Sequence, residues 1–322
     1  MKRFKNILFV KSDTNNEAAL AHAVVLAKHN QADLTMTDVS EEIPDVSGQG
    51  IPEEVVREIT NSILESYRKE LEKLAETYQD KIEIDIQFKQ GKFFLTIIRE
   101  VLRNNHDLVI KAAENDNGIM SQFFSTTDMH LLRKCPCPVW LVKPGEPETI
   151  KRIVAAVDFD ESSDDGKNQA LNSQIMEMSI SLAHREKAEL HVVHAWRPIA
   201  DQVPSTVLTV RPELEVEEYI EDFRQCRVRR LSQLMEEAIS WVGQDVYDAV
   251  NPKLHAIRGW TPQVISEQIK ELNADLLVMG TIGRTGIPGY YIGNTAESIL
   301  NCIDCSLLAI KPREFVSPVT LE

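Results

Sequence analysis

Cysteine is scarce in this chain, which has five cysteines among 322 residues. So few cysteines form no disulfide framework in a chain of this length. Two close pairs, CPC at 135–137 and CIDC at 302–305, are each open to interpretation as a metal or redox pair, or as small apolar residues leading into a strand. We favour the second interpretation, because no further Cys or His pair follows at zinc spacing.

Long apolar runs are lacking as well. The run nearest the N-terminus, Ile7 to Val10, is too short for the core of a signal peptide. No run approaches the roughly 18 apolar residues of a membrane span. We therefore expect a cytoplasmic protein that has no contact with a membrane.

Basic residues are outnumbered, with 35 Lys and Arg against 50 Asp and Glu, which gives a net charge of −15. Such a chain is unsuited to nonspecific binding of nucleic acid or of an anionic membrane, since Lys and Arg must engage the phosphates. A small anionic ligand held by backbone amides is still compatible with this charge.

Two parts of the chain match each other at a constant offset of 168 residues. Residues 91–144 align with 259–312 without a gap, so that DLVIKA at 107–112 matches DLLVMG at 275–280. The beginnings of the two copies also match, at a smaller offset, because the second copy carries extra residues in its early part. The repeat predicts two domains, residues 1–146 and 147–322.

Each copy consists of short apolar strands that alternate with helical patterns. In the second copy we expect strands near 152–158, 189–196, 253–258, 275–280 and 306–312, and helices at 170–186, 212–242, 261–273 and from 294. This alternation predicts βαβ units and a parallel sheet that is covered on both faces. The fold class is therefore α/β, with two tandem open five-stranded parallel-sheet domains. A ligand crevice in such a domain lies at the carboxyl ends of the strands, where the strand order reverses.

Glycine is also rare, yet five of the 13 glycines lie in GTIGRTGIPGYYIGNT at 280–295, which we call the glycine-rich segment. The segment follows an expected strand and ends at a predicted capping box, with Asn294 as N-cap and Glu297 three residues later. Glycine lets the backbone approach a ligand, and the free N–H groups of a helix N-terminus bind anions. The segment therefore predicts a phosphate site, with a capped surface loop as the alternative. A Walker loop is excluded, because no Gly-Lys-Ser/Thr is present.

The spacing of Gly280, Gly283 and Gly293, followed by a small polar residue, resembles the nucleotide-binding signature of the universal stress protein family. Asp158 at the end of the first strand and VVHAW at 192–196 also agree with the family pattern. The resemblance covers both copies and is to a tandem, E-type member with the universal stress protein fold, which is adenine nucleotide alpha hydrolase-like. Asn294 departs from the commoner Ser or Thr but keeps the ability to form hydrogen bonds.

The resemblance implies that ATP or a related nucleotide binds the second domain, with no metal beyond the Mg²⁺ that accompanies a nucleotide. Asp158 is then expected to contact the adenine or ribose, and backbone groups of Val192 or Val193 to hold the base. Arg284 is either a phosphate ligand or a solvated charge. The ribose and phosphates are assigned to the following residues: Gly280, Gly283, Gly293, Asn294 and Thr295.

Two histidines of the expected second strand, His191 and His194, are open to interpretation as ligands or bases. Because they alternate on the strand, we favour one packed and one exposed histidine.

The first copy lacks the signature. By alignment, Gly280, Gly283, Gly289 and Gly293 become Ala112, Asn115, Ser121 and Ser125. Asp158 becomes Ser12, with the neighbouring Asp13 as the alternative if the strand is shifted. Glu114 and Asp116 add negative charge beside the former anion site, which disfavours phosphate. Ser125 and Asp128 still form a good helix cap. The first domain is therefore expected to be a structural partner or a pocket for a different ligand.

We expect a stress-resistance protein that binds a nucleotide and is not an enzyme. The sequence shows none of the features that would indicate catalysis: paired carboxylates at a defined spacing, a Ser/His/Asp arrangement, or a lysine in the glycine-rich segment. A slow ATPase and a ligand-independent scaffold that acts through protein contacts are the alternatives. In the family the closing strand makes the dimer contact, so the resemblance implies that 138–144 and 306–312 pair within the chain, with a homodimer as a further alternative.

Overall fold

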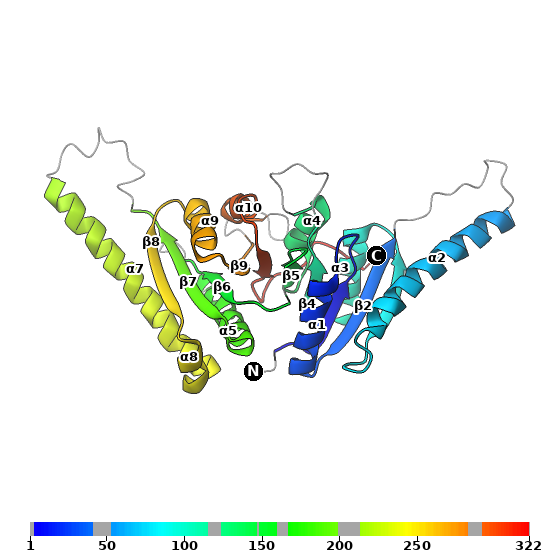
Figure 1. Ribbon diagram of the computed structural model, residues 1–322. Helices are drawn as coiled ribbons and strands as arrows, with labels where there is room; N and C mark the ends of the chain where they lie inside the picture. The colour runs from blue at the N-terminus through cyan, green and yellow to red at the C-terminus, as the bar shows by residue number, and fades with distance from the viewer. Residues whose placement is uncertain are drawn as a thin grey trace. The chain divides into compact units, whose positions relative to one another are not determined.

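The computed structural model describes residues 3–40, 53–114, 124–146, 148–159, 167–198, 213–282 and 292–321. The chain divides into two compact units (Figure 1). The first unit is Met1–Glu148 with Phe315–Glu322, and the second is Thr149–Ile287 with Tyr291–Glu314. Residues 288–290 lie outside the described part of the chain.

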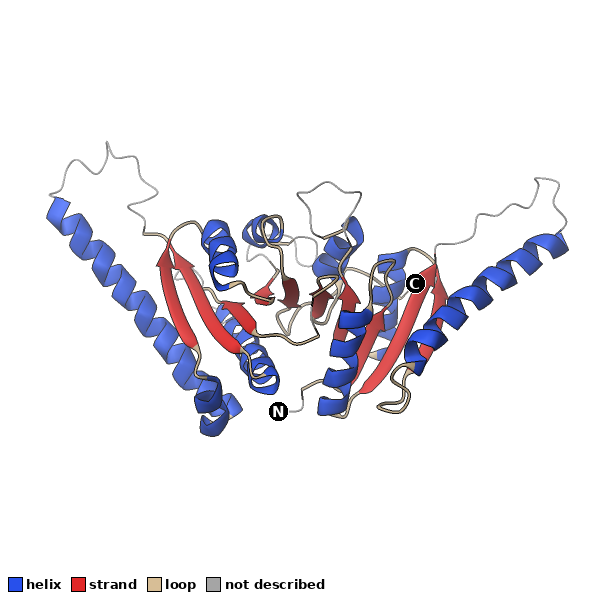
Figure 2. Ribbon diagram, viewed as in Figure 1, coloured by secondary structure: helices blue, strands red, loops and turns tan. Residues whose placement is uncertain are grey.

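The described part of the first unit alternates strands and helices from end to end (Figure 2). The elements are β1 (Asn6–Val10), α1 (Glu17–Asn30), β2 (Asp33–Ser40), α2 (Glu53–Glu76), β3 (Asp85–Gln90), α3 (Phe93–Asn104), β4 (Leu108–Ala112), α4 (Thr126–Lys134) and β5 (Val139–Val142).

Over its described residues, the second unit repeats this order with one additional helix. Its elements are β6 (Arg152–Ala156), α5 (Lys167–Glu186), β7 (Glu189–Trp196), α7 (Glu213–Val242), α8 (Gln244–Val250), β8 (Lys253–Arg258), α9 (Thr261–Leu272), β9 (Leu276–Gly280), α10 (Asn294–Leu300) and β10 (Ser306–Ile310).

The strands of the two units follow the same order, and every pair within a unit is parallel. The order is β3-β2-β1-β4-β5 in the first unit and β8-β7-β6-β9-β10 in the second. In both units the first strand lies between its second and fourth strands, so that Ile153 pairs with Leu190 on one side and Leu276 on the other. The order reverses at this point, and the predicted α/β class and parallel sheets are confirmed.

Helices cover both faces of the strands in each unit (Figure 1), as expected where the strand order of a parallel sheet reverses. In the second unit α5 contacts α7, and α9 contacts α10. The strands are therefore buried on both faces, and Ile153, Val154 and Ala155 of β6 have no exposed area. Such strands read as continuous apolar runs instead of alternating ones.

Two parts of the chain differ from the sequence expectation. Helix α8 begins after Gly243, whose φ of 88° belongs to the left-handed region and separates α8 from α7. The C-terminal residues, expected in the second domain, belong to the first unit. There the Ser317 hydroxyl donates to the Lys134 carbonyl at 2.7 Å, and Arg99 Nε donates to the Thr320 carbonyl at 3.1 Å.

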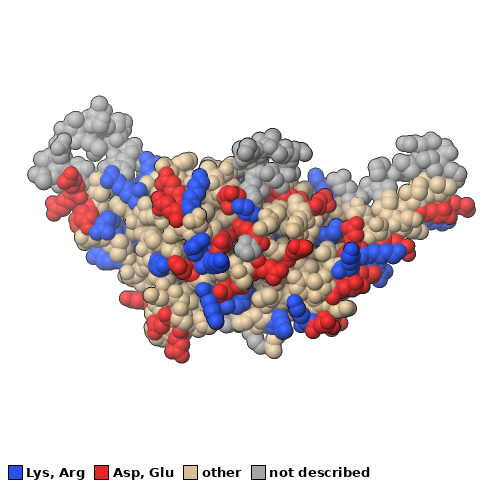
Figure 3. Space-filling view, viewed as in Figure 1, with Lys and Arg blue, Asp and Glu red and all other residues tan. Residues whose placement is uncertain are grey.

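No described helix is long and apolar enough to cross a membrane. On the face drawn in Figure 3, acidic and basic side chains of the described residues are interspersed. Within each unit, the described residues on that face form no continuous basic track of the kind that follows a nucleic-acid backbone.

Candidate functional site

The candidate site of the second unit lies where β6, β7 and β9 end, beside the point at which the strand order reverses. Asp158 follows β6 by two residues, and its side chain is exposed there. Its backbone is fixed from α5: Asn172 Nδ2 donates to the Asp158 carbonyl at 2.7 Å, and the Asp158 N–H donates to Asn172 Oδ1 at 3.2 Å. The predicted position of Asp158 at the strand end is thus held by an asparagine that sequence reasoning missed.

The first unit contains the same pair of hydrogen bonds between an asparagine side chain and the backbone at a strand end, which we call the asparagine bracket. Asn16 Nδ2 donates to the Ser12 carbonyl at 2.8 Å, and the Ser12 N–H donates to Asn16 Oδ1 at 3.0 Å. Ser12 is therefore the structural counterpart of Asp158, as the alignment predicts. The two asparagines have different offsets from their strands because of the extra residues before α5, and this difference hid the pair in the sequence.

Val192 and Val193 lie inside β7, and neither has any exposed area. Val193 pairs with Ala156 on one side and His255 on the other. Its carbonyl accepts the Val157 N–H at 3.1 Å. These valines therefore offer a ligand no side-chain surface.

Gly280 ends β9 and has a packing role. A Cβ atom built on Gly280 would lie 2.7 Å from Leu171 Cδ2, which is closer than real Cβ contacts allow. The glycine thus lets α5 pack closely on β9. Gly283 and Arg284, also predicted as site residues, lie outside the described residues.

The two ends of the glycine-rich segment form a stem, made of Thr281, Ile282, Ile292 and Gly293. Ile282 and Ile292 form an antiparallel bridge, and the Gly293 N–H donates to the Thr281 carbonyl at 3.2 Å. The stem therefore places Gly293 directly beyond the end of β9.

Helix α10 begins at Asn294, the residue expected to be its cap. Asn294 is the first helical residue, and Gly293 is the N-cap, with φ −62° and ψ 141°. The prediction of Asn294 as N-cap of a capping box is therefore wrong. Because glycine has no side chain, α10 has no side-chain cap hydrogen bond, while the side chains of Asn294 and Thr295 are exposed at its first turn.

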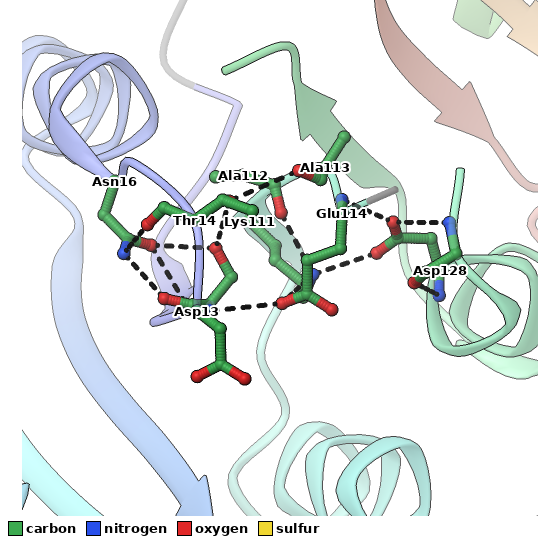
Figure 4. A network of polar contacts seen from close by, with 10 residues as sticks. Asp13, Thr14, Asn16, Lys111, Ala112, Ala113, Glu114 and Asp128 are labelled. Carbon is green, nitrogen blue, oxygen red and sulfur yellow. Dashed lines mark hydrogen bonds and ion pairs between the residues drawn. The ribbon is translucent and has the colours of Figure 1, made fainter. Parts of the chain in front are cut away.

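The corresponding place in the first unit is filled by its own side chains (Figure 4). Ser125 caps α4 by accepting the Asp128 N–H at 3.1 Å, and Asp128 Oδ2 accepts the N–H groups of Glu114 at 2.9 Å and Ser125 at 3.2 Å. The predicted cap at Ser125 and Asp128 is confirmed as a capping box. The negative charge at this end of α4 also suits the helix dipole.

A buried cation completes this arrangement. Lys111 Nζ lies 3.0 Å from Asp128 Oδ1 and 3.0 Å from Glu114 Oε1, and the side chains of Lys111 and Asp128 have no exposed area. We call Lys111, Glu114 and Asp128 the ionic trio. At the 168 offset its members correspond to Met279, Ile282 and Ala296, so the second unit has apolar residues at all three positions.

Two cations near the candidate site come from outside the glycine-rich segment. The ammonium of Lys311, which follows β10, donates a hydrogen bond to Thr281 Oγ1 at 2.9 Å. Arg227 of α7 lies over the Phe223 ring and donates to the Phe159 carbonyl at 3.3 Å. The sequence pattern of the segment indicates neither residue, because both are remote from it in sequence.

Both histidines of β7 are buried, so the expectation that one is exposed is wrong. His194 Nδ1 lies 3.2 Å from the Val157 carbonyl, and burial lowers the His194 pKa to about 4. His191 Nδ1 lies 3.0 Å from His255 Nε2 of the neighbouring β8, and burial lowers the His191 pKa as well. Both imidazoles are therefore neutral at pH 7.

The cysteines lie in different surroundings. Cys135 and Cys137 are buried with their Sγ atoms 3.6 Å apart, and burial raises the pKa of the Cys137 thiol. Cys305 is buried and Cys302 is exposed. Within the described ranges, no group of three or more His, Cys, Asp or Glu side chains could hold a metal ion.

Comparison with known proteins agrees with this geometry. The model of the universal stress protein family matches residues 3–143 and 149–311. Universal stress protein E of Escherichia coli (strain K12) is 34% identical over 232 residues, which cover 71% of this chain and 68% of that protein. Universal stress protein E of Photorhabdus laumondii is 29% identical over 331 residues, covering 99% and 98%. A crystal structure of a putative universal stress protein from Pseudomonas aeruginosa UCBPP-PA14 superposes with a TM-score of 0.67 and 25% identity, covering 98% of this chain and 95% of that one. With the family matched twice along the chain and the same strand order in both units, this protein belongs to the universal stress protein family as a member with two tandem domains.

Proposed function

We propose that the second unit binds ATP or a related nucleotide, and that the protein acts in stress resistance as a ligand-binding protein. The observation that carries this proposal is the contrast between two equivalent helix starts. Helix α4 begins at a place filled by the ionic trio, whereas α10 begins at an uncapped glycine beside apolar counterparts. A helix start that no described side chain caps, at the carboxyl edge of a parallel sheet, suits an anionic ligand.

The proposed roles follow the positions of the residues at the ends of β6, β7 and β9. Asp158, exposed and held by Asn172, contacts the adenine or ribose. The base lies at the carboxyl end of β7, and any contact from Val192 or Val193, which have no exposed area in this structure, would be through the backbone. Gly280, Gly283, Gly293, Asn294 and Thr295 surround the ribose and phosphates, with Arg284 as a further phosphate ligand and Mg²⁺ arriving with the nucleotide.

Two other functions make different predictions for the purified protein. A ligand-independent scaffold would carry no nucleotide, and a slow ATPase would release ADP with time. Described residues near the site give little support to catalysis, because His194 is buried and engaged with the Val157 carbonyl. Mass spectrometry of small molecules released from the purified protein separates the three cases.

The decisive test is a titration of the whole chain with Mg-ATP by calorimetry. We expect one nucleotide per chain, because the glycine signature is kept in the second copy and replaced in the first, and because α10 lacks the side-chain cap that its counterpart α4 has. Two equivalent sites would contradict the assignment of binding to the second unit alone. Absence of binding for ATP, ADP and AMP would contradict the proposed function.

A further inference from the structure

Lys311 brings a buried positive charge to the base of the glycine-rich segment. It directly follows β10, and only 2% of its surface is exposed. Its ammonium donates to Thr281 Oγ1 at 2.9 Å, and Thr281 has no exposed area. A buried ammonium needs hydrogen-bond acceptors, so this contact fixes both side chains.

Thr281 also contacts the residue at which α10 starts. It is the first residue of the stem, and its carbonyl accepts the Gly293 N–H at 3.2 Å. Gly293 is in turn the N-cap of α10. One chain of contacts therefore runs from Lys311 through Thr281 and Gly293 to the first turn of the helix.

The first unit lacks this contact. At the 168 offset Lys311 corresponds to Lys143, but Thr281 corresponds to Ala113, which has no hydroxyl group. The asparagine bracket, by contrast, is present in both units. A feature shared by both units belongs to the common fold, whereas the Lys311–Thr281 contact occurs in the unit that keeps the glycine signature.

We propose that Lys311 is a positioning residue for the nucleotide: by holding the Thr281 hydroxyl it fixes the stem, and so places Gly293 and the first turn of α10 at the phosphates. This inference rests on the proposed function of the second unit. Lys311 acts through Thr281 and not by direct contact with the ligand.

The test compares Thr281→Val, which removes the hydroxyl at nearly constant volume, with Thr281→Ser, which keeps it. By calorimetry with Mg-ATP, Thr281→Val should weaken binding by about tenfold or more, since a hydrogen bond to a charged group is lost. Thr281→Ser should bind within about twofold of the wild type, since the hydroxyl bond is preserved. Lys143→Met in the first unit is the matched control and should leave the affinity unchanged.

A double variant separates positioning from stability. Lys311→Met with Thr281→Val replaces both polar partners by apolar groups, which restores much of the stability lost when one partner is left unpaired. We expect this variant to recover the unfolding midpoint but not the affinity, a result that a purely structural role would not give. It also serves as the test if Thr281→Val alone does not fold.

Three results would overturn the inference, and they are distinct from failure of the proposed function. If the wild type binds Mg-ATP and folded Thr281→Val binds equally well, the stem does not position the ligand. If Lys311→Met weakens binding and Thr281→Val does not, Lys311 acts without Thr281. If the double variant binds as the wild type does, neither residue is needed. A wild type that binds no nucleotide contradicts the function itself.

Discussion

Gly293 lies between the stem and the first turn of α10, where its backbone has φ −62° and ψ 141°. This conformation is open to any residue, so the backbone itself does not require glycine at this position. Gly280 differs, because a Cβ there would meet Leu171 inside the unit.

We predict that Gly293→Val abolishes binding of Mg-ATP while the protein stays folded. The branched side chain would occupy the proposed phosphate space, whereas its cost as an N-cap is only ~1 kcal/mol of unfolding free energy. Calorimetry measures the affinity, and thermal unfolding measures the stability. Ser125→Val at the equivalent position of the first unit is the control, which should lower stability without changing affinity. Unchanged affinity in folded Gly293→Val would remove Gly293 from the site.

At this scale the sequence predicts residues whose chemistry is local, and it misses those that depend on packing. Asp158 and its counterpart Ser12 are placed correctly because each ends an apolar strand. Asn172 and Lys311 contact the site from other elements, so no local pattern indicates them. The exposure expected for one histidine is wrong, because β8 places His255 beside His191.

Among the elements, α4 and α10 are equivalent helices whose first turns differ: α4 has a side-chain cap and α10 has none. The α4 end is satisfied by Ser125 and Asp128, and Lys111 neutralises the buried carboxylate. At α10 the corresponding positions are apolar. The ionic trio therefore does within the first unit what a bound anion is proposed to do in the second.

We predict that Lys111→Met destabilises the protein by ~3–5 kcal/mol, because it leaves a buried carboxylate without its partner. The triple variant Lys111→Met, Glu114→Ile, Asp128→Ala, which copies the second unit, should recover most of that loss. The remaining deficit should be ~1 kcal/mol for the lost cap at α4. Urea denaturation monitored by circular dichroism gives both free energies.

Two results would contradict this interpretation of the trio. A triple variant as unstable as Lys111→Met would show that the three residues are not an independent group. A stable Lys111→Met would show that Asp128 does not need the ammonium. The affinity for Mg-ATP should be unchanged in both variants, since they alter only the first unit.

Element types follow from the sequence because strands buried on both faces read as apolar runs, and the helices between them carry polar residues. The extra helix α8 is missed because a left-handed glycine, Gly243, interrupts what reads as one helix and a loop. The N-cap of α10 is displaced by one residue because Asn294 has the side chain of a cap but a helical backbone. Local composition does not decide between two adjacent cap positions.

For the whole molecule, the repeat predicts that the two units form a pair through their closing strands. Strand β5 is the last in the order of the first unit, and β10 is the last in that of the second. Both are short and apolar, VWLV and SLLAI. An apolar strand whose outer edge has no partner is an aggregation hazard, so pairing of the two edges within one chain would remove both hazards.

We predict that Val142→Asp combined with Ile310→Asp separates the units and increases the radius of gyration in small-angle X-ray scattering. Charges in both closing strands would oppose each other and lose hydration if the strands paired. Circular dichroism serves as the control for folding. Hydrogen exchange of the wild type gives a second test that needs no variant: the amides of β5 and β10 that face away from β4 and β9 should exchange slowly if the edges are paired. Fast exchange at those amides, or a folded double variant as compact as the wild type, would contradict the pairing and make contact between separate chains the remaining way to cover these edges.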